Sequence, residues 1–185
     1  MCIRDRDGTD SKYLQTKFRA ENHIKNSLQN YVLIKPSVVF GPDDNFFNTF
    51  AKLARIFPIL PIVGCEVKFQ PCYVGDVGDA INYIVETETL AKTYELAGPK
   101  SYTLYELIKF MLKEIRRKNV IIPLPFGIGK FQAFFMQLLP KPILTIDQIK
   151  ILESGDNITT GKNNTFSDLN ILPRSVESVV PTYLK

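Results

Sequence analysis

The 185-residue chain has no tryptophan, one histidine and three cysteines. Cys2, Cys65 and Cys72 form no Cys-x-x-Cys pair and show no metal-ligand spacing, so we expect reduced thiols in a cytoplasmic compartment and no metal. The histidine, His23, has no partner set with which to bind zinc. Lysine and arginine outnumber aspartate and glutamate by 23 to 19, and this net charge of +4 is too small to indicate a nucleic-acid partner.

A glycine-rich phosphate-binding turn is also absent from the printed sequence. Dinucleotide-binding folds hold the pyrophosphate on such a turn at a helix N-terminus. No G-x-x-G-x-x-G follows a strand pattern here, and the nearest glycine pair, Gly127 and Gly129, comes directly after Pro125. We interpret that pair as the start of a helix and not as a phosphate-binding loop.

The apolar residues follow helix and strand patterns in turn, and this alternation predicts an α/β fold. The expected helices are 11–28, 45–56, 77–87, 104–118 and 126–139, and the expected strands are 31–35, 67–74, 93–96 and 120–122. Ser11 and Asp76 are predicted to cap their helices, although Asp76 is also a candidate catalytic carboxylate. With 45% hydrophobic residues the chain has enough apolar material for one ordinary core.

The segment 11–21 carries the most informative pair, Tyr13 and Lys17, four residues apart. On a helix these two side chains share one face. A tyrosine phenol has an ordinary pKa of about 10. A nearby ammonium favours the phenolate and lowers that pKa, which makes the tyrosine a workable general acid and base. Such pairs also arise by chance on amphipathic helices, so the neighbouring sequence has to support the assignment.

The supporting sequence is Tyr-Val-Leu-Ile-Lys-Pro-Ser-Val-Val-Phe-Gly-Pro at 31–42, a buried-strand pattern followed by a proline turn. The helix, strand and loop in this order resemble the extended short-chain dehydrogenase/reductase family. More narrowly, they resemble its NAD-dependent epimerase/dehydratase-like branch, which includes the alpha-subcomplex subunit nine type of respiratory complex I. Further matching stretches lie at 45–48, 69–77, 93–99 and 181–184, so the resemblance covers nearly everything after residue 10.

The resemblance implies a domain plan. Residues 11–100 are expected to be the C-terminal part of a Rossmann-like NAD(P)-binding domain, and 101–185 a small α/β, largely helical region on the substrate side. Residues 1–10 resemble translated sequencing-adaptor sequence, so we expect a non-native leader and an intact parent that begins upstream. The serine that the family carries before the tyrosine is expected in that upstream part, because Ser11 is too close to Tyr13 for its role.

The resemblance also implies a cofactor and site residues. The intact parent is expected to bind NAD or NADP, with Tyr13 exchanging a proton with the substrate and Lys17 lowering its pKa and holding the ribose. Pro36 and Ser37 either line the cofactor, beside the nicotinamide, or only shape a loop. On the substrate side the expected residues are Phe69 and Gln70.

Two functions follow from these expectations. In the first, the parent is an oxidoreductase or epimerase acting on a secondary alcohol or ketone, and this fragment alone is inactive. In the second, it is a non-catalytic nucleotide-binding accessory or assembly subunit of respiratory complex I, with complex I subunits as partners. The second function places it on the inner face of the respiratory membrane as a peripheral protein.

A phenylalanine-rich segment at 126–139 bears on that second function. It is shorter than the roughly 20 residues that a bilayer-spanning helix needs. It is either a helix packed on the core, or a substrate lid or surface helix in contact with lipid or a partner. The basic residues at 113–118 are either a solvated helix end or a site for anionic lipid.

Overall fold

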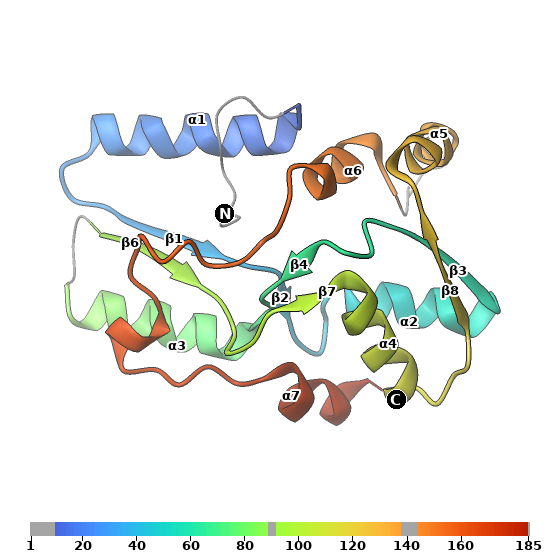
Figure 1. The fold of residues 1–185 in the computed structure, drawn as a ribbon. Helices are drawn as coiled ribbons and strands as arrows, with labels where there is room; N and C mark the ends of the chain where they lie inside the picture. Colours follow the sequence, from blue (N-terminus) through green and yellow to red (C-terminus); the bar gives the residue numbers. More distant parts are fainter. Residues whose placement is uncertain (1–9, 89–91, 138–143, 185) are drawn as a thin grey trace.

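The computed structural model describes residues 10–88, 92–137 and 144–184. Helices and strands alternate along these ranges (Figure 1). In chain order the elements are α1 (Lys12–Ser27), β1 (Val32–Pro36), β2 (Val39–Phe40), α2 (Phe47–Ile56), β3 (Ile59–Val63), β4 (Lys68–Phe69), β5 (Cys72–Tyr73), α3 (Val74–Glu86), β6 (Lys92–Leu96), β7 (Tyr102–Thr103), α4 (Leu104–Glu114), β8 (Val120–Leu124), α5 (Phe126–Met136), α6 (Ile146–Glu153), the 3-10 helix η1 (Phe166–Leu169) and α7 (Val176–Tyr183).

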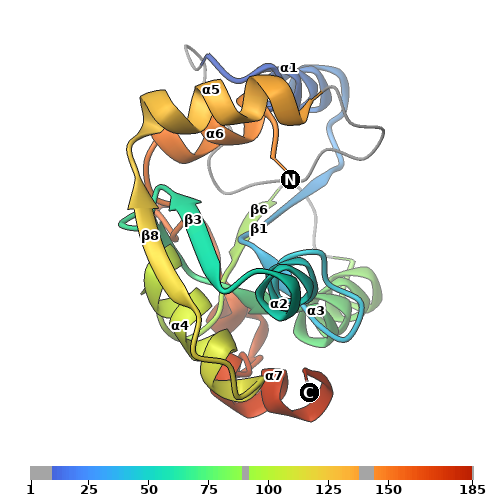
Figure 2. The same ribbon diagram turned by 90° about the vertical axis from the view of Figure 1, so that its right-hand side faces the viewer.

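The strands pair mainly in parallel. β1 lies beside β6, β2 beside β5 and β3 beside β8, whereas β4 and β7 are antiparallel. Parallel neighbours need long crossovers, and helices supply them here. In the two views α1, α5 and α6 lie on one side of the strands, and α2, α3, α4 and α7 lie on the other (Figures 1 and 2). The predicted α/β class is confirmed.

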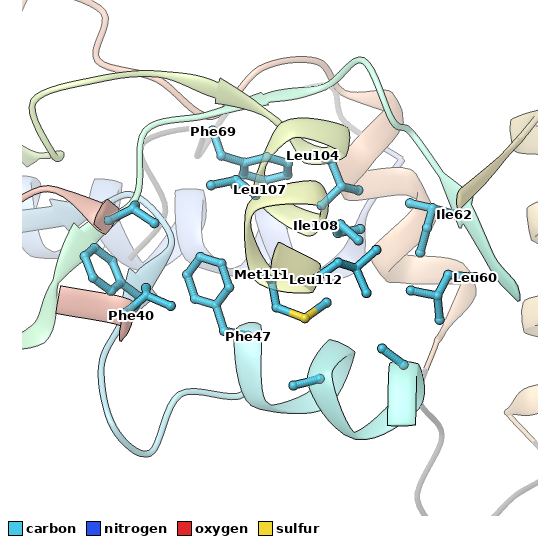
Figure 3. Packing of buried hydrophobic residues seen from close by; sticks show 14 of the residues in the cluster. Phe40, Phe47, Leu60, Ile62, Phe69, Leu104, Leu107, Ile108, Met111 and Leu112 are labelled. Carbon is cyan, nitrogen blue, oxygen red and sulfur yellow. The ribbon is translucent and has the colours of Figure 1, made fainter. Parts of the chain in front are cut away.

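The largest core cluster lies between α4, α2 and the strands (Figure 3). The apolar stripe predicted on α4 has six members, of which Leu104, Leu107, Ile108, Met111 and Leu112 are buried and Ile115 is partly buried. They pack with Phe40 of β2 and Phe47 of α2, whose rings meet edge to face with centroids 6.2 Å apart. This cluster joins side chains from both sides of residue 100, and the predicted division at that point stays a prediction.

Several predicted elements differ from the structure. The strand expected over 67–74 is split into β4 and β5, because the intervening Gln70 donates its backbone N–H to Asn157 (3.1 Å) and Pro71 has no N–H to donate. The Asp76 cap is wrong, since α3 already begins at Val74. The buried Asp76 carboxylate instead accepts a hydrogen bond from the backbone N–H of Arg174 (2.6 Å).

The ends of α4 follow local chemistry. Thr103 and Glu106 form a capping box, in which each side chain accepts a hydrogen bond from the other's backbone N–H (3.1 and 2.7 Å). The helix ends at Glu114 and not at residue 118 as predicted, because Arg116 adopts a left-handed φ of 53° that an α-helix does not continue.

Candidate functional site

Helix α1 places Tyr13 and Lys17 side by side, as the spacing predicts. The Lys17 Nζ atom lies 5.6 Å from the centroid of the Tyr13 ring, within the range of a cation–π contact. Tyr13 is 43% exposed. An ammonium close to a tyrosine favours the phenolate form that proton transfer by a tyrosine uses.

A second Tyr-x-x-x-Lys pair shows that this geometry alone is not specific. On α4, the Lys109 Nζ atom lies 5.9 Å from the Tyr105 ring centroid. What separates the two pairs is their place in the fold. The pair on α1 precedes β1, whose carboxyl end lies at the type of sheet edge where α/β proteins bind ligands.

The N-terminus of α1 is fixed by two side chains. Ser11 Oγ accepts a hydrogen bond from the Leu14 N–H (3.3 Å), which confirms the predicted cap. Asp147 of α6 adds a second cap. Its carboxylate accepts hydrogen bonds from the Ser11 hydroxyl (3.0 Å) and from the backbone N–H groups of Lys12 (2.8 Å) and Tyr13 (3.2 Å). A carboxylate at this position also complements the helix dipole, so α6 holds the backbone of the candidate catalytic tyrosine.

We expect Asp147→Ala to lower the free energy of unfolding by about 0.5–2 kcal/mol, the range for loss of a helix cap. The reason is that three donors at the start of α1 lose their acceptor. Urea unfolding followed by circular dichroism measures the change. The exposed Asp43 provides a matched control, since Asp43→Ala makes the same change outside this cap. Equal unfolding midpoints for the two variants would contradict the capping role.

Pro36 ends β1, and Ser37 follows it. The Ser37 N–H donates to the Leu96 carbonyl of β6 (2.9 Å), and its buried hydroxyl donates to the Asn157 carbonyl (3.0 Å). Ser37 therefore joins the ends of two parallel strands to the loop that follows α6. This is a rigid position at the carboxyl edge of the strands, and the expectation that Pro36 and Ser37 lie beside a nicotinamide stays a prediction.

Phe69 and Gln70 lie next to this junction. The Phe69 ring is buried in the core, with its centroid 6.5 Å from that of Phe46. The Gln70 side chain joins two loops, because its Nε2 donates to the Gly98 carbonyl (2.7 Å) and its Oε1 accepts from the Thr159 N–H (3.1 Å). These contacts give both residues a structural role, and a substrate contact stays a prediction for each.

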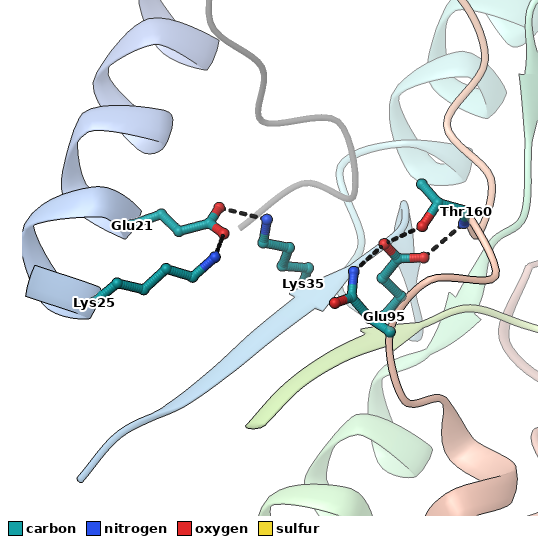
Figure 4. A network of polar contacts seen from close by, with 6 residues as sticks. Glu21, Lys25, Lys35, Glu95 and Thr160 are labelled. Atoms are coloured by element: carbon teal, nitrogen blue, oxygen red, sulfur yellow. Dashed lines mark hydrogen bonds and ion pairs between the residues drawn. The ribbon is translucent and has the colours of Figure 1, made fainter. Parts of the chain in front are cut away.

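A buried ionic contact between α1 and β1 was not predicted (Figure 4). Glu21 forms an ion pair with Lys35 and another with Lys25 (2.7 Å). Burial raises the pKa of the Glu21 carboxyl, but hydrogen bonds and charges from the two lysines outweigh burial and hold that pKa below its usual value. One feature of the sequence indicates such a contact, namely a lysine, Lys35, inside an otherwise apolar strand pattern.

A second buried carboxylate, Glu95 of β6, holds the loop after α6 (Figure 4). It accepts hydrogen bonds from the Thr160 N–H (2.6 Å), the Thr160 hydroxyl (2.8 Å) and the Asn163 amide (2.7 Å). Together with the Ser37–Asn157 contact, these bonds fix that loop over the ends of β1 and β6.

The described cysteines, Cys65 and Cys72, are buried free thiols. Burial raises the pKa of Cys72 to about 12, which keeps it a thiol at neutral pH and therefore a weak nucleophile. Cys2 lies outside the described residues. Within the described ranges no group of three histidine, cysteine, aspartate or glutamate side chains is placed to hold a metal ion.

Helix α5 packs through one narrow face. Ala133 is buried with Val63 and Ile149, and a Cβ atom at Gly129 would lie only 2.4 Å from Val63 Cγ2. Gly129 therefore permits a close approach of α5 to β3, and the predicted helix start is confirmed.

Three of the four phenylalanines of α5 lie outside the core, whereas the fourth, Phe126, packs against it. Phe131 and Phe135 are 68% and 53% exposed, Phe134 is also exposed, and the Phe131 and Phe135 rings contact each other at 5.0 Å. α5 therefore packs on the core through one face and exposes these phenylalanines on the other, so a core-packed helix and a surface helix that contacts a partner both stay predictions. Leu138 and Leu139, also assigned to this helix, lie outside the described residues. None of the helices in the described part of the chain is long and apolar enough to cross a membrane.

These elements define a Rossmann-like α/β protein, and solved structures share the fold. A dTDP-4-dehydrorhamnose reductase from Bacillus anthracis, in complex with NADP, matches with a TM-score of 0.65 and 20% identity over 92% of this chain and 54% of its own. A nucleoside-diphosphate-sugar epimerase from Staphylococcus aureus matches with a TM-score of 0.70 and 14% identity over 95% of this chain and 61% of its own. Residues 4–132 match the family model of the RmlD substrate binding domain, and the chain belongs to that family.

Sequence relatives agree with the narrower resemblance. The NADH dehydrogenase [ubiquinone] 1 alpha subcomplex subunit 9, mitochondrial, of Arabidopsis thaliana is 30% identical over 99% of this chain and 48% of its own length. The NADH-ubiquinone oxidoreductase 40 kDa subunit, mitochondrial, of Neurospora crassa is 29% identical over 96% of this chain and 47% of its own. The predicted kinship is confirmed, and the chain spans about half the length of these curated relatives.

Proposed function

We propose that the intact protein binds a nicotinamide dinucleotide, NAD or NADP, and uses Tyr13 and Lys17 in oxidoreductase or epimerase chemistry. The observation that carries this proposal is the Lys17 ammonium 5.6 Å from the accessible Tyr13 ring, on the helix that leads into β1. Membership of the RmlD substrate binding domain family and the fold shared with an NADP-bound reductase support it.

The residues of this chain fit the nicotinamide end of such a cofactor, which supplies a hydride when it is bound. Tyr13 exchanges a proton with the substrate oxygen, and Lys17 stabilises the phenolate and donates a hydrogen bond to the ribose. Pro36 and Ser37 form the neighbouring loop at the strand edge. Dinucleotide-binding folds hold the pyrophosphate on a glycine-rich turn, and these 185 residues contain no such motif.

A second candidate function is that of a non-catalytic accessory subunit of respiratory complex I. Two observations favour it, namely the names of the relatives and the exposed phenylalanines of α5. One fold can hold a nucleotide with or without turnover. In this function the protein attaches peripherally to the inner face of the respiratory membrane through complex I subunits. In a non-catalytic subunit, Phe69 and Gln70 would have no substrate to contact.

A fluorescence titration with NADH and with NADPH tests the proposal. The intact protein is expected to bind at least one of them, and Lys17→Ala is expected to weaken that binding. The 185-residue chain is the control, and it is expected not to bind tightly because it lacks the glycine-rich turn. An intact protein that binds neither nucleotide, or a 185-residue chain that binds with micromolar affinity, would contradict the proposal.

A further inference from the structure

Four residues follow one another along α1 at intervals of four, so that each is a neighbour of the next, namely Tyr13, Lys17, Glu21 and Lys25. The first two are the candidate catalytic pair. The third, Glu21, is only 4% exposed and contacts Lys35 of β1, which is 7% exposed. The side chains of Glu21 and Lys35 point toward one another across the gap between helix and strand (Figure 4).

The position of Lys35 connects this contact to the site. Lys35 directly precedes Pro36 and Ser37, and Glu21 lies one helical turn after Lys17. The ion pair therefore joins the helix that carries the proton-transfer pair to the strand that carries the proposed nicotinamide loop. Charge-assisted hydrogen bonds are directional, whereas apolar contacts are not. A pair of this kind sets how far the helix is rotated and shifted along the strand.

We propose that Glu21 and Lys35 are positioning residues, which fix Tyr13 and Lys17 relative to the Pro36–Ser37 loop for dinucleotide binding. This inference rests on the proposed function. Lys25 has no equal part in it, because its side chain is 38% exposed and pairs with Glu21 within the same helix. The Lys25 contact therefore does not join α1 to β1.

Substitutions in a buried ion pair can separate its role in positioning the helix from its effect on the stability of the fold. Removing one partner leaves an uncompensated buried charge and destabilises the fold, whereas replacing both partners with apolar side chains is often neutral or stabilising. Lys35→Met is therefore expected to lower the melting temperature of the intact protein. The double variant Glu21→Leu/Lys35→Met is expected to recover most of that loss. Lys35→Arg, which keeps the charge, is expected to resemble the wild type.

The deciding readout is the dissociation constant for NADPH or NADH, whichever the wild type binds. We expect the double variant to bind about tenfold more weakly or worse in spite of its recovered stability, because misplacement by about 1 Å is costly to a site of this kind. Lys25→Met, the same substitution at the exposed partner, is expected to bind like the wild type, and so is Lys35→Arg.

The outcomes distinguish this inference from the proposed function. If the wild type binds a dinucleotide and the double variant binds it equally well, the pair contributes stability alone and only this inference is overturned. It is also overturned if Lys25→Met weakens binding as much as the double variant does. A wild type that binds neither dinucleotide contradicts the proposed function and removes the positioning role with it.

Discussion

Tyr13→Phe is expected to lower turnover of the intact protein by about 10²–10⁴-fold, the range for loss of a general acid and base. It removes only the hydroxyl, so dinucleotide binding is expected to be unchanged. Lys17→Ala is expected to lower turnover and to weaken dinucleotide binding, because it removes the cation beside the tyrosine and a donor to the ribose. The absorbance of the reduced nicotinamide measures turnover with a panel of secondary alcohols and ketones, including nucleoside-diphosphate sugars.

The pair on α4 provides the matched control. Tyr105 and Lys109 have the same spacing and nearly the same geometry as Tyr13 and Lys17, with 5.9 Å from ammonium to ring centroid. Tyr105→Phe and Lys109→Ala are therefore expected to leave turnover and binding unchanged. Full turnover in a folded Tyr13→Phe variant would eliminate the catalytic assignment. A protein that binds dinucleotide but turns over none of the panel would favour the accessory subunit.

Replacing Phe131 and Phe135 with serine is expected to release the intact protein from the membrane fraction without unfolding it. Both side chains are mostly exposed, so their removal takes little from the core, whereas loss of a buried phenylalanine costs about 3–5 kcal/mol. The measurement is co-sedimentation with membranes and with complex I, together with thermal unfolding. The buried Ala133 and the close approach of Gly129 to Val63 are unchanged in the variant, so α5 is expected to keep its place on β3.

Phe57 is the matched control for this experiment. It is a similarly exposed phenylalanine, but it follows α2 and lies outside α5. Phe57→Ser is therefore expected to stay with the membrane fraction. If the α5 variant unfolds, its phenylalanines belong to a packed interface within the protein. If the wild type never co-sediments with membranes or complex I, the docking role is wrong and a free enzyme is favoured.

Local patterns were sufficient to predict the elements that carry the candidate site. The cap at Ser11, the apolar stripe of α4 and the strand before Pro36 each depend on residues close in sequence, and each is confirmed. The spacing of Tyr13 and Lys17 likewise fixes their contact, because four residues make about one helical turn.

The remaining features depend on residues far apart in the sequence. The second cap on α1 comes from Asp147, more than 130 positions away, and no local pattern specifies it. Aspartate is a common capping residue, but the Asp76 carboxylate accepts a hydrogen bond from the backbone N–H of Arg174, near the other end of the chain. Which side of α5 is exposed could not be predicted either, for a different reason. A helix that is apolar on most faces does not show in its sequence which face is covered.

A structure of the intact protein with bound NADPH or NADH tests the central claim most directly. We expect the Lys17 ammonium within hydrogen-bonding distance of the ribose, about 2.7–3.2 Å. We also expect the Tyr13 hydroxyl facing the nicotinamide, and the Pro36–Ser37 loop beside the ring. A dinucleotide bound away from α1 and the carboxyl end of β1, or a nicotinamide out of reach of Tyr13, would contradict the claim.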